Sequence, residues 1–262
     1  GEDAGRLQAL GLRGSRGMNE WSGRLSGKVV WNGIIEVCGD VVVPEGASLR
    51  IEAGTRVRFA ARPGWSCSVF RAAPEGYPIE ASEREACDLV ILGRLEAAGT
   101  SNAPIFMGDG DVPWGGILFL QSASGVLRHC IIKVKTEYAL QTFDDSRLAL
   151  ESCNVEEAQV GIVSRGLSRV KVLGGCVRAA RCGAVACEGS RVVLDNLQIQ
   201  DSPQGVCAED WALVRAKGSR FASNRDFAVS AQGHSWARLE GCGFERSGER
   251  TLGREQARID VH

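Results

Sequence analysis

Three carboxylates and one arginine fall at the same part of successive repeated segments, and their types could support chemistry. They are Asp144, Asp145, Arg165 and Glu188. Carboxylates can transfer protons or hold a calcium ion, and a neighbouring arginine can assist either role. Polar turn residues exposed to water would give the same pattern, and we favour that interpretation. A catalytic site at these four residues is the alternative.

A second set of residues is basic and predicts an anion-binding face. In RVVLD (191–195), Val192 and Leu194 are expected to face inward and Arg191 outward. This register gives two outward columns: Arg147, Arg169, Arg191, Leu213 and Trp236, then Ala149, Lys171, Val193, Arg215 and Arg238. The cations could bind an acidic polymer, and Trp236 could stack on a sugar ring. The alternative is a mixed surface neutralised by Glu151, Asp195 and Glu240, with Lys217 among them.

These columns rest on an internal repeat of 22 to 24 residues. Units begin at residues 114, 138, 161, 183, 205 and 227, and the segments 39–60 and 88–110 have the same rhythm. Apolar residues alternate within each unit, Gly, Asn, Asp and Ser mark the turns, and no unit has room for a helix. A fixed period of this length indicates a solenoid. The fold class is therefore all-β, a parallel β-helix of about eight coils.

The chain resembles right-handed parallel β-helix proteins of the pectin-lyase-like superfamily. The resemblance is carried by GDVVVPEGASLRIEAGTRVRFA, by GRLEAAGTSNAPIFMG followed by WGGILF, and by the later coils, and it covers about residues 27–250. It implies a right-handed coil. It does not imply one activity, because the superfamily includes lyases, glycoside hydrolases, epimerases, adhesins and proteins without known chemistry.

The enzyme motifs of that superfamily match poorly here. Its hydrolases place carboxylates beside Gly-His-Gly and Arg-Ile-Lys, whereas here FDDS and the QGHS that contains His234 are about four coils apart. Its pectate-type lyases need a calcium-binding carboxylate cluster with an Arg or Lys base. The resemblance therefore implies calcium only if Asp144, Asp145, Arg165 and Glu188 form a lyase site. Otherwise we expect neither a cofactor nor a metal.

Ten cysteines occur without a CxxC pair, so a zinc ribbon is disfavoured. The register stacks Cys130, Cys153, Cys176, Leu197, Ser219 and Cys242 in one interior column. We expect small buried hydrophobic residues there rather than a metal or redox centre. Free thiols in such a column fit a reducing cytosol, so we expect a cytoplasmic location. Secretion after removal of a leader is the alternative, although the N-terminal residues show no intact signal peptide.

The repeat divides the chain into three parts. Residues 1–26 are expected to form an N-terminal arm or cap, 27–250 the β-helix, and 251–262 a C-terminal cap or tail. Residues 61–87 interrupt the period and bring Trp65, Phe70 and Tyr77 into one insertion loop. We expect this loop to pack as a flap. Cys67 and Cys87 are compatible with a disulfide or with two free thiols.

The net charge of −1 and the absence of any known module argue against nucleic-acid binding, and no apolar run is long enough to span a membrane. We therefore expect a non-catalytic binding or scaffold protein that presents a basic sheet face to an acidic polysaccharide or a protein partner. A polysaccharide lyase or glycoside hydrolase is the alternative. A purely structural assembly unit is a third interpretation, since an uncapped solenoid end would favour homo-oligomers.

Overall fold

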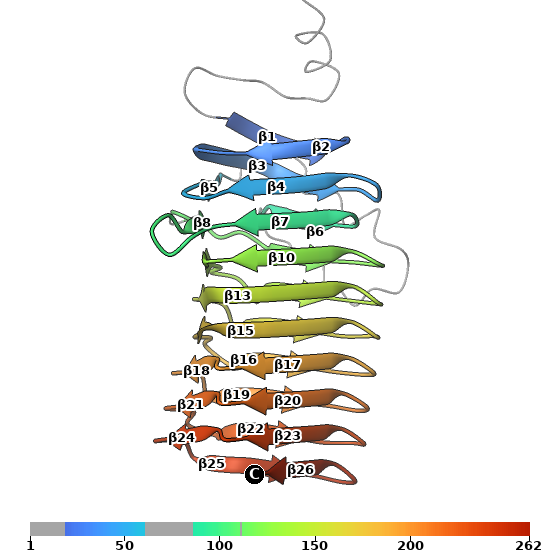
Figure 1. Ribbon diagram of the computed structural model, residues 1–262, viewed down its shortest axis with the longest axis vertical. Coiled ribbons are helices and arrows are strands. Elements are labelled where there is room, and N and C mark those ends of the chain that lie inside the picture. Colours follow the sequence, from blue (N-terminus) through green and yellow to red (C-terminus); the bar gives the residue numbers. More distant parts are fainter. Residues whose placement is uncertain (1–18, 61–85, 111) are drawn as a thin grey trace, which may run out of the picture.

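The computed structural model describes residues 19–60, 86–110 and 112–262, and every regular element in these ranges is a β-strand. The 26 strands pair in parallel, and the chain winds as a right-handed β-helix (Figure 1). This hand is the one that nearly all crossovers between parallel strands adopt. The described residues include no helix of the length and apolarity needed to cross a membrane. The expected fold class is confirmed.

The coils stack into three parallel sheets, which we call sheets I, II and III in the order in which each coil passes through them. Sheet I carries the predicted basic columns. Its strands are β2 (Lys28–Trp31), β4 (Ser48–Glu52), β7 (Arg94–Ala98), β10 (Ser124–Arg128), the first halves of β13 (Arg147–Glu156) and β15 (Arg169–Val177), β17 (Arg191–Asp195), β20 (Leu213–Lys217), β23 (Trp236–Glu240) and β26 (Arg258–Val261).

Sheets II and III complete each coil. Sheet II contains the first halves of β1 (Asn19–Arg24) and β3 (Ile34–Val43), β5 (Arg56–Phe59), β8 (Ile105–Met107), β11 (Cys130–Lys133), the second halves of β13 and β15, β18 (Gln198–Gln200), β21 (Arg220–Ala222) and β24 (Gly243–Glu245). Sheet III contains the second halves of β1 and β3, β6 (Asp88–Ile91), β9 (Gly116–Phe119), β12 (Tyr138–Thr142), β14 (Val160–Ser164), β16 (Cys182–Ala186), β19 (Gln204–Ala208), β22 (Phe227–Ala231) and β25 (Glu249–Gly253).

The solenoid has about ten coils, so the expected eight was too few. The sequence period is regular only from Ser124 onward, where equivalent residues of sheet I lie 22 or 23 positions apart. Upstream, the equivalent residues Lys28, Ser48, Arg94 and Ser124 are unevenly spaced, and this hides the first coils from a search for a fixed period. At the C-terminal end, β25 completes the coil of β23 and β24, and β26 adds a final strand to sheet I.

The corner between sheets III and I needs a left-handed backbone in coil after coil. The residues with positive φ at this corner are Gly27, Gly46, Gln121, Asp144, Gly166, Glu188, Asp210, Gly233 and Glu255. Glycine adopts this conformation freely, and Asp adopts it more readily than most side chains. Backbone geometry therefore favours glycine and Asp at this corner, although Gln121, Glu188 and Glu255 adopt the same conformation.

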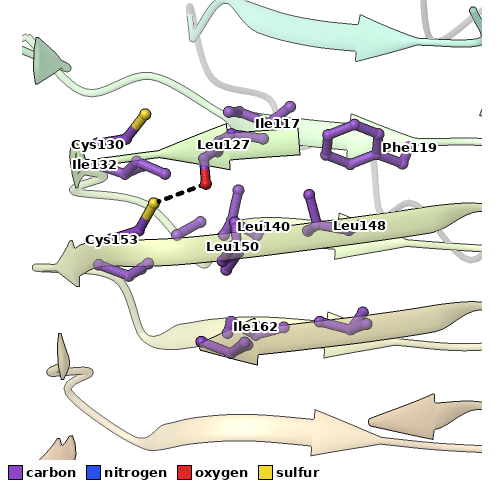
Figure 2. Packing of buried hydrophobic residues seen from close by; sticks show 14 of the residues in the cluster. Ile117, Phe119, Leu127, Cys130, Ile132, Leu140, Leu148, Leu150, Cys153 and Ile162 are labelled. Carbon is purple, nitrogen blue, oxygen red and sulfur yellow. Dashed lines mark hydrogen bonds between the residues drawn. The ribbon is translucent and has the colours of Figure 1, made fainter. Parts of the chain in front are cut away.

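The interior is built from stacked apolar side chains, and the predicted register of sheet I is confirmed. Leu148, Val170, Val192, Val214 and Ala237 form one buried column, and Leu150, Val172, Leu194, Ala216 and Leu239 form the next. Leu148 and Leu150 project into the same core as Phe119 and Leu127 of the preceding coil (Figure 2). This continuous core supplies the main stabilisation of the stack.

The predicted cysteine column is wrong at one position. Cys130 and Cys153 lie on successive coils, and the Cys153 thiol donates to the Leu127 carbonyl at 3.3 Å (Figure 2). Cys153 is paired with Gly175, however, and the half-buried Cys176 is paired with Asn154. A Cβ on residue 175 would lie 2.0 Å from the Cys153 carbonyl oxygen, so only glycine fits there. The interior column therefore continues through Gly175 instead of Cys176.

Candidate functional site

The outer face of sheet I brings the predicted basic residues together. Arg147, Arg169 and Arg191 occupy the same register position on three successive strands, and all three are exposed. Lys171 is also exposed and lies two residues after Arg169 on β15. Adjacent strands are about 4.8 Å apart, so these cations form a closely spaced row on the surface that runs parallel to the solenoid axis. We call these four residues the basic ladder.

The basic ladder differs from the other cations of the face in its pairing. Within the described ranges, none of its four side chains forms an ion pair or a side-chain hydrogen bond. By contrast, Arg215 and Arg238 both contact Glu240, at 3.3 and 2.7 Å. The predicted mixed surface therefore exists at the C-terminal coils, while the basic ladder has no carboxylate partner among the residues that the structure describes.

The pKa of Glu240 reflects this division. Burial raises the pKa of its carboxyl group, but the hydrogen bond and positive charge of Arg215, with Arg238 and Lys217 nearby, outweigh burial and lower it overall. Glu240 thus interacts with the cations of its own and the preceding coil.

Aromatic side chains lie beyond the C-terminal end of the basic ladder. Leu213 and then Trp236 continue the column of Arg191, and the Trp236 indole donates to Asp260 at 3.0 Å. At the adjacent corner, Trp211 is 64% exposed and stacks on His234, with ring centroids 4.2 Å apart. Two indoles are therefore exposed at the surface beyond the C-terminal end of the basic ladder.

A hollow of about 840 Å³ lies over the N-terminal coils of the same sheet. Its walls come from β2, β4, β7 and β10 and from the turns between them, and they include the cations Lys28, Arg50 and Arg94 and the acids Glu45 and Glu96. The repeat pattern of the sequence did not predict this hollow, because the period is irregular in these coils. The outer face of sheet I is thus concave at one end and carries the basic ladder in the middle.

The candidate catalytic residues hold the corner turns together. Asp144 accepts a hydrogen bond from the Gln121 backbone N–H, and Glu188 accepts one from the Gly166 N–H, both at 2.8 Å. Asp145 accepts from the Ser122 hydroxyl at 3.0 Å. Each carboxylate therefore bonds to the turn of the preceding coil, a role that accounts for its residue type without catalysis.

Arg165 does not share the column of these carboxylates. Thr142, Ser164 and Ala186 are register partners, so Arg165 is aligned with Phe143 and Cys187, one position before Gly166. Its Nε atom is buried and has no hydrogen-bond partner. The structure therefore places Arg165 next to the carboxylate column, whereas the sequence interpretation placed it within the column.

A pair of aspartates that the sequence analysis missed lies on sheet III. Asp88 is the first residue of β6, and its backbone N–H donates to Oδ1 of the buried Asp40 at 2.8 Å. Burial raises the Asp88 pKa well above its usual value, and the charge of Asp40 adds to this effect.

On β1 and β3, Glu20, Glu36 and Cys38 bring possible metal-ligand atoms within 4.8 Å of one another, but each of these residues also interacts with another group.

The remaining predicted site residues cannot be placed. Trp65, Phe70 and Tyr77 of the insertion loop lie outside the described residues, as does Cys67. Cys87 is buried just before β6. The expected flap and the Cys67–Cys87 pairing therefore stay predictions.

Comparison with known proteins gives no family for this chain. No protein-family model matches it, and no curated protein sequence matches it significantly. The class of protein is thus defined by the fold alone, a parallel β-solenoid of stacked coils. Any activity has to be argued from the surface described above.

Proposed function

We propose that this protein is a non-catalytic β-helix scaffold that binds an acidic polysaccharide along the outer face of sheet I. The observation that carries the proposal is the basic ladder, in which Arg147, Arg169, Lys171 and Arg191 face solvent without a carboxylate partner among the described residues. We also propose membership of the pectin-lyase-like superfamily, on the strength of the solenoid architecture.

Electrostatics favour an extended anion over a compact one. Like charges about 5 Å apart on adjacent strands repel each other, and an anion placed between them would relieve this repulsion. Because the cations follow the axis, a polymer lying parallel to the axis would meet several of them at once. Arginine also binds carboxylate and sulfate groups through two parallel hydrogen bonds, and this adds directional preference.

The surroundings of the basic ladder favour a sugar polymer. Trp236 lies two coils beyond Arg191 in the same column, and the exposed Trp211 lies at the neighbouring corner. Exposed aromatic rings can stack on the apolar faces of pyranose rings, and the hollow at the other end of sheet I could receive a chain end or branch. A protein partner with an acidic surface is the main competing occupant.

Charge reversal tests the proposal directly. The double variant R169E/R191E should lose most of its retention on an immobilised acidic polysaccharide such as polygalacturonate or heparin, and wild-type retention should fall as salt rises. R178E/R220E is the matched control, since it changes the net charge equally at residues outside sheet I that pair with Glu156 and Glu245. Equal retention of both variants and the wild type would overturn the proposal.

A further inference from the structure

Two cysteines of sheet III are in contact outside the main core. Sγ of Cys182 on β16 lies 3.4 Å from Sγ of Cys207 on β19, in the next coil. Both belong to a separate hydrophobic cluster with Val160 and Val163, whereas Ala184 and Val206 of the same strands belong to the main core. Neither cysteine formed part of the column predicted from sequence.

We propose that Cys182 and Cys207 form a redox pair, which a peroxide oxidises to a disulfide that staples β16 to β19. A disulfide has an S–S distance of about 2.05 Å and needs its Cα atoms within about 7 Å, so the two sulfurs must approach each other by about 1.4 Å and the backbone of β16 and β19 must shift locally with them. The two residues are not direct register partners, since Cys182 pairs with Gln204 and Cys207 with Val185. The bond would therefore run diagonally between neighbouring coils.

A second pair of interacting cysteines lies in the main core. Cys130 and Cys153 are equivalent residues of successive coils, and their thiols interact with each other as well as with the backbone carbonyls of Arg128 and Leu127. The Cys182 and Cys207 sulfurs lie within hydrogen-bond distance of each other. Cys207 is 7% exposed, whereas Cys130 and Cys153 are 0% and 2% exposed, so we expect peroxide to reach the Cys182–Cys207 pair first.

The surroundings assign different roles to the two thiols. The hydrogen bond from Cys182 lowers the pKa of Cys207 against the opposing effect of burial, and the Ser230 hydroxyl and the charge of Arg181 act in the same direction. The pKa of Cys182 is raised by its hydrogen bond with Cys207 and by burial. Cys207 is also the more exposed, at 7% against 1%. Cys207 is thus the attacking thiolate and Cys182 the resolving thiol.

The oxidation proceeds in two balanced steps. The Cys207 thiolate attacks one oxygen of hydrogen peroxide, the O–O bond breaks, and Cys207 sulfenic acid and hydroxide form. The Cys182 sulfur then attacks the Cys207 sulfur, expels the sulfenic oxygen as water, and forms the S–S bond. In total, two thiols and one peroxide give one disulfide and two waters, and each sulfur loses one electron.

The disulfide would strengthen the solenoid where neighbouring coils meet. Each coil of a solenoid is stabilised mainly by its neighbours, so unfolding can spread from coil to coil. A covalent link between β16 and β19 would oppose that spread and would also restrict the unfolded chain. The pair would be a dithiol in a reducing compartment and a disulfide in an oxidising one. This inference does not depend on the proposed function.

Mass spectrometry of the folded, full-length chain tests the inference. Reduced protein is treated with hydrogen peroxide, the remaining thiols are blocked with N-ethylmaleimide, and the chain is digested without reduction. The first cross-link to form should join Cys182 to Cys207. Because Cys187 shares a tryptic peptide with Cys182, C187S must retain this cross-link. C182S should stop at a Cys207 sulfenic acid that dimedone traps, and C130S should behave as the wild type.

Thermal unfolding gives a second measurement. Oxidised wild type should unfold at a higher temperature than reduced wild type, while C182S should show no difference between the two treatments. Failure of folded wild type to form the 182–207 cross-link, or its formation only in denaturant, would overturn the redox pair. Equal unfolding temperatures of cross-linked and reduced wild type would overturn the stapling role.

Discussion

Arg169 and Arg191 occupy the same register position on the neighbouring strands β15 and β17, and neither has a carboxylate partner among the described residues. A surface that served only solubility would be expected to mix its charges, as this protein does around Glu240. The basic ladder therefore carries an electrostatic cost that a bound polyanion would remove.

Neutralising Arg169 should stabilise the free protein at low salt. Removal of one charge from a column of like charges relieves repulsion of about 0.2–1 kcal/mol, and salt should screen the gain. The measurement is the free energy of unfolding of R169Q in urea, at low and at high ionic strength. R215Q is the control and should show no gain, because Arg215 loses its contact with Glu240. A gain for R169Q that persists at high salt would contradict the electrostatic explanation.

Polysaccharide panels should remain intact in the presence of this protein. Asp144, Asp145 and Glu188 accept hydrogen bonds from the preceding coil, and Arg165 lies outside their column. Acidic and neutral polysaccharides would be incubated with the protein, with and without calcium, and the products read by mass spectrometry. Shortened or unsaturated oligosaccharides that disappear with D145N would instead establish the lyase or hydrolase alternative.

Asp88 should make folding more favourable at low pH than at neutral pH. Burial and Asp40 raise the folded-state pKa of Asp88 well above its unfolded value, which is about 3.9. Its contribution is therefore fully present below the unfolded pKa and is lost as pH rises through the folded pKa. D88N cannot ionise and should be more stable than wild type at neutral pH, with little difference at pH 4. Chemical unfolding across this range tests the sign, and an advantage that shrinks as pH rises would refute it.

Gly175 should tolerate alanine less well than Gly174. Both residues have positive φ, so each Ala variant pays about 1–2 kcal/mol for a left-handed backbone. A Cβ at residue 175 would in addition collide with the Cys153 carbonyl, whereas at residue 174 the nearest atom is the Ser152 hydroxyl at 3.7 Å. G175A should therefore unfold at clearly lower denaturant concentration than G174A. Equal losses would mean that the neighbouring coil moves to accept the methyl group.

The sequence by itself determined the fold class and most of the register. Period-two apolar alternation at a fixed interval forces parallel strands to stack, and residues such as Val170, Val192 and Val214 can be buried only in that register. The outward columns followed at once, because neighbouring residues of a strand point to opposite faces. The residues of the basic columns could therefore be predicted from the sequence alone.

Only the tertiary structure decided which of those residues are free to bind. Whether Glu240 reaches Arg215 and Arg238, or whether Glu188 bonds to the Gly166 N–H, depends on side-chain directions that the repeat does not encode. The Cys182–Cys207 contact is diagonal, so an alignment of equivalent positions cannot reveal it. The position of Cys176 outside the interior column likewise depends on the pairing of Cys153 with Gly175 and of Asn154 with Cys176. Periodicity fixes which positions are equivalent, whereas close contacts between coils fix what each residue does there.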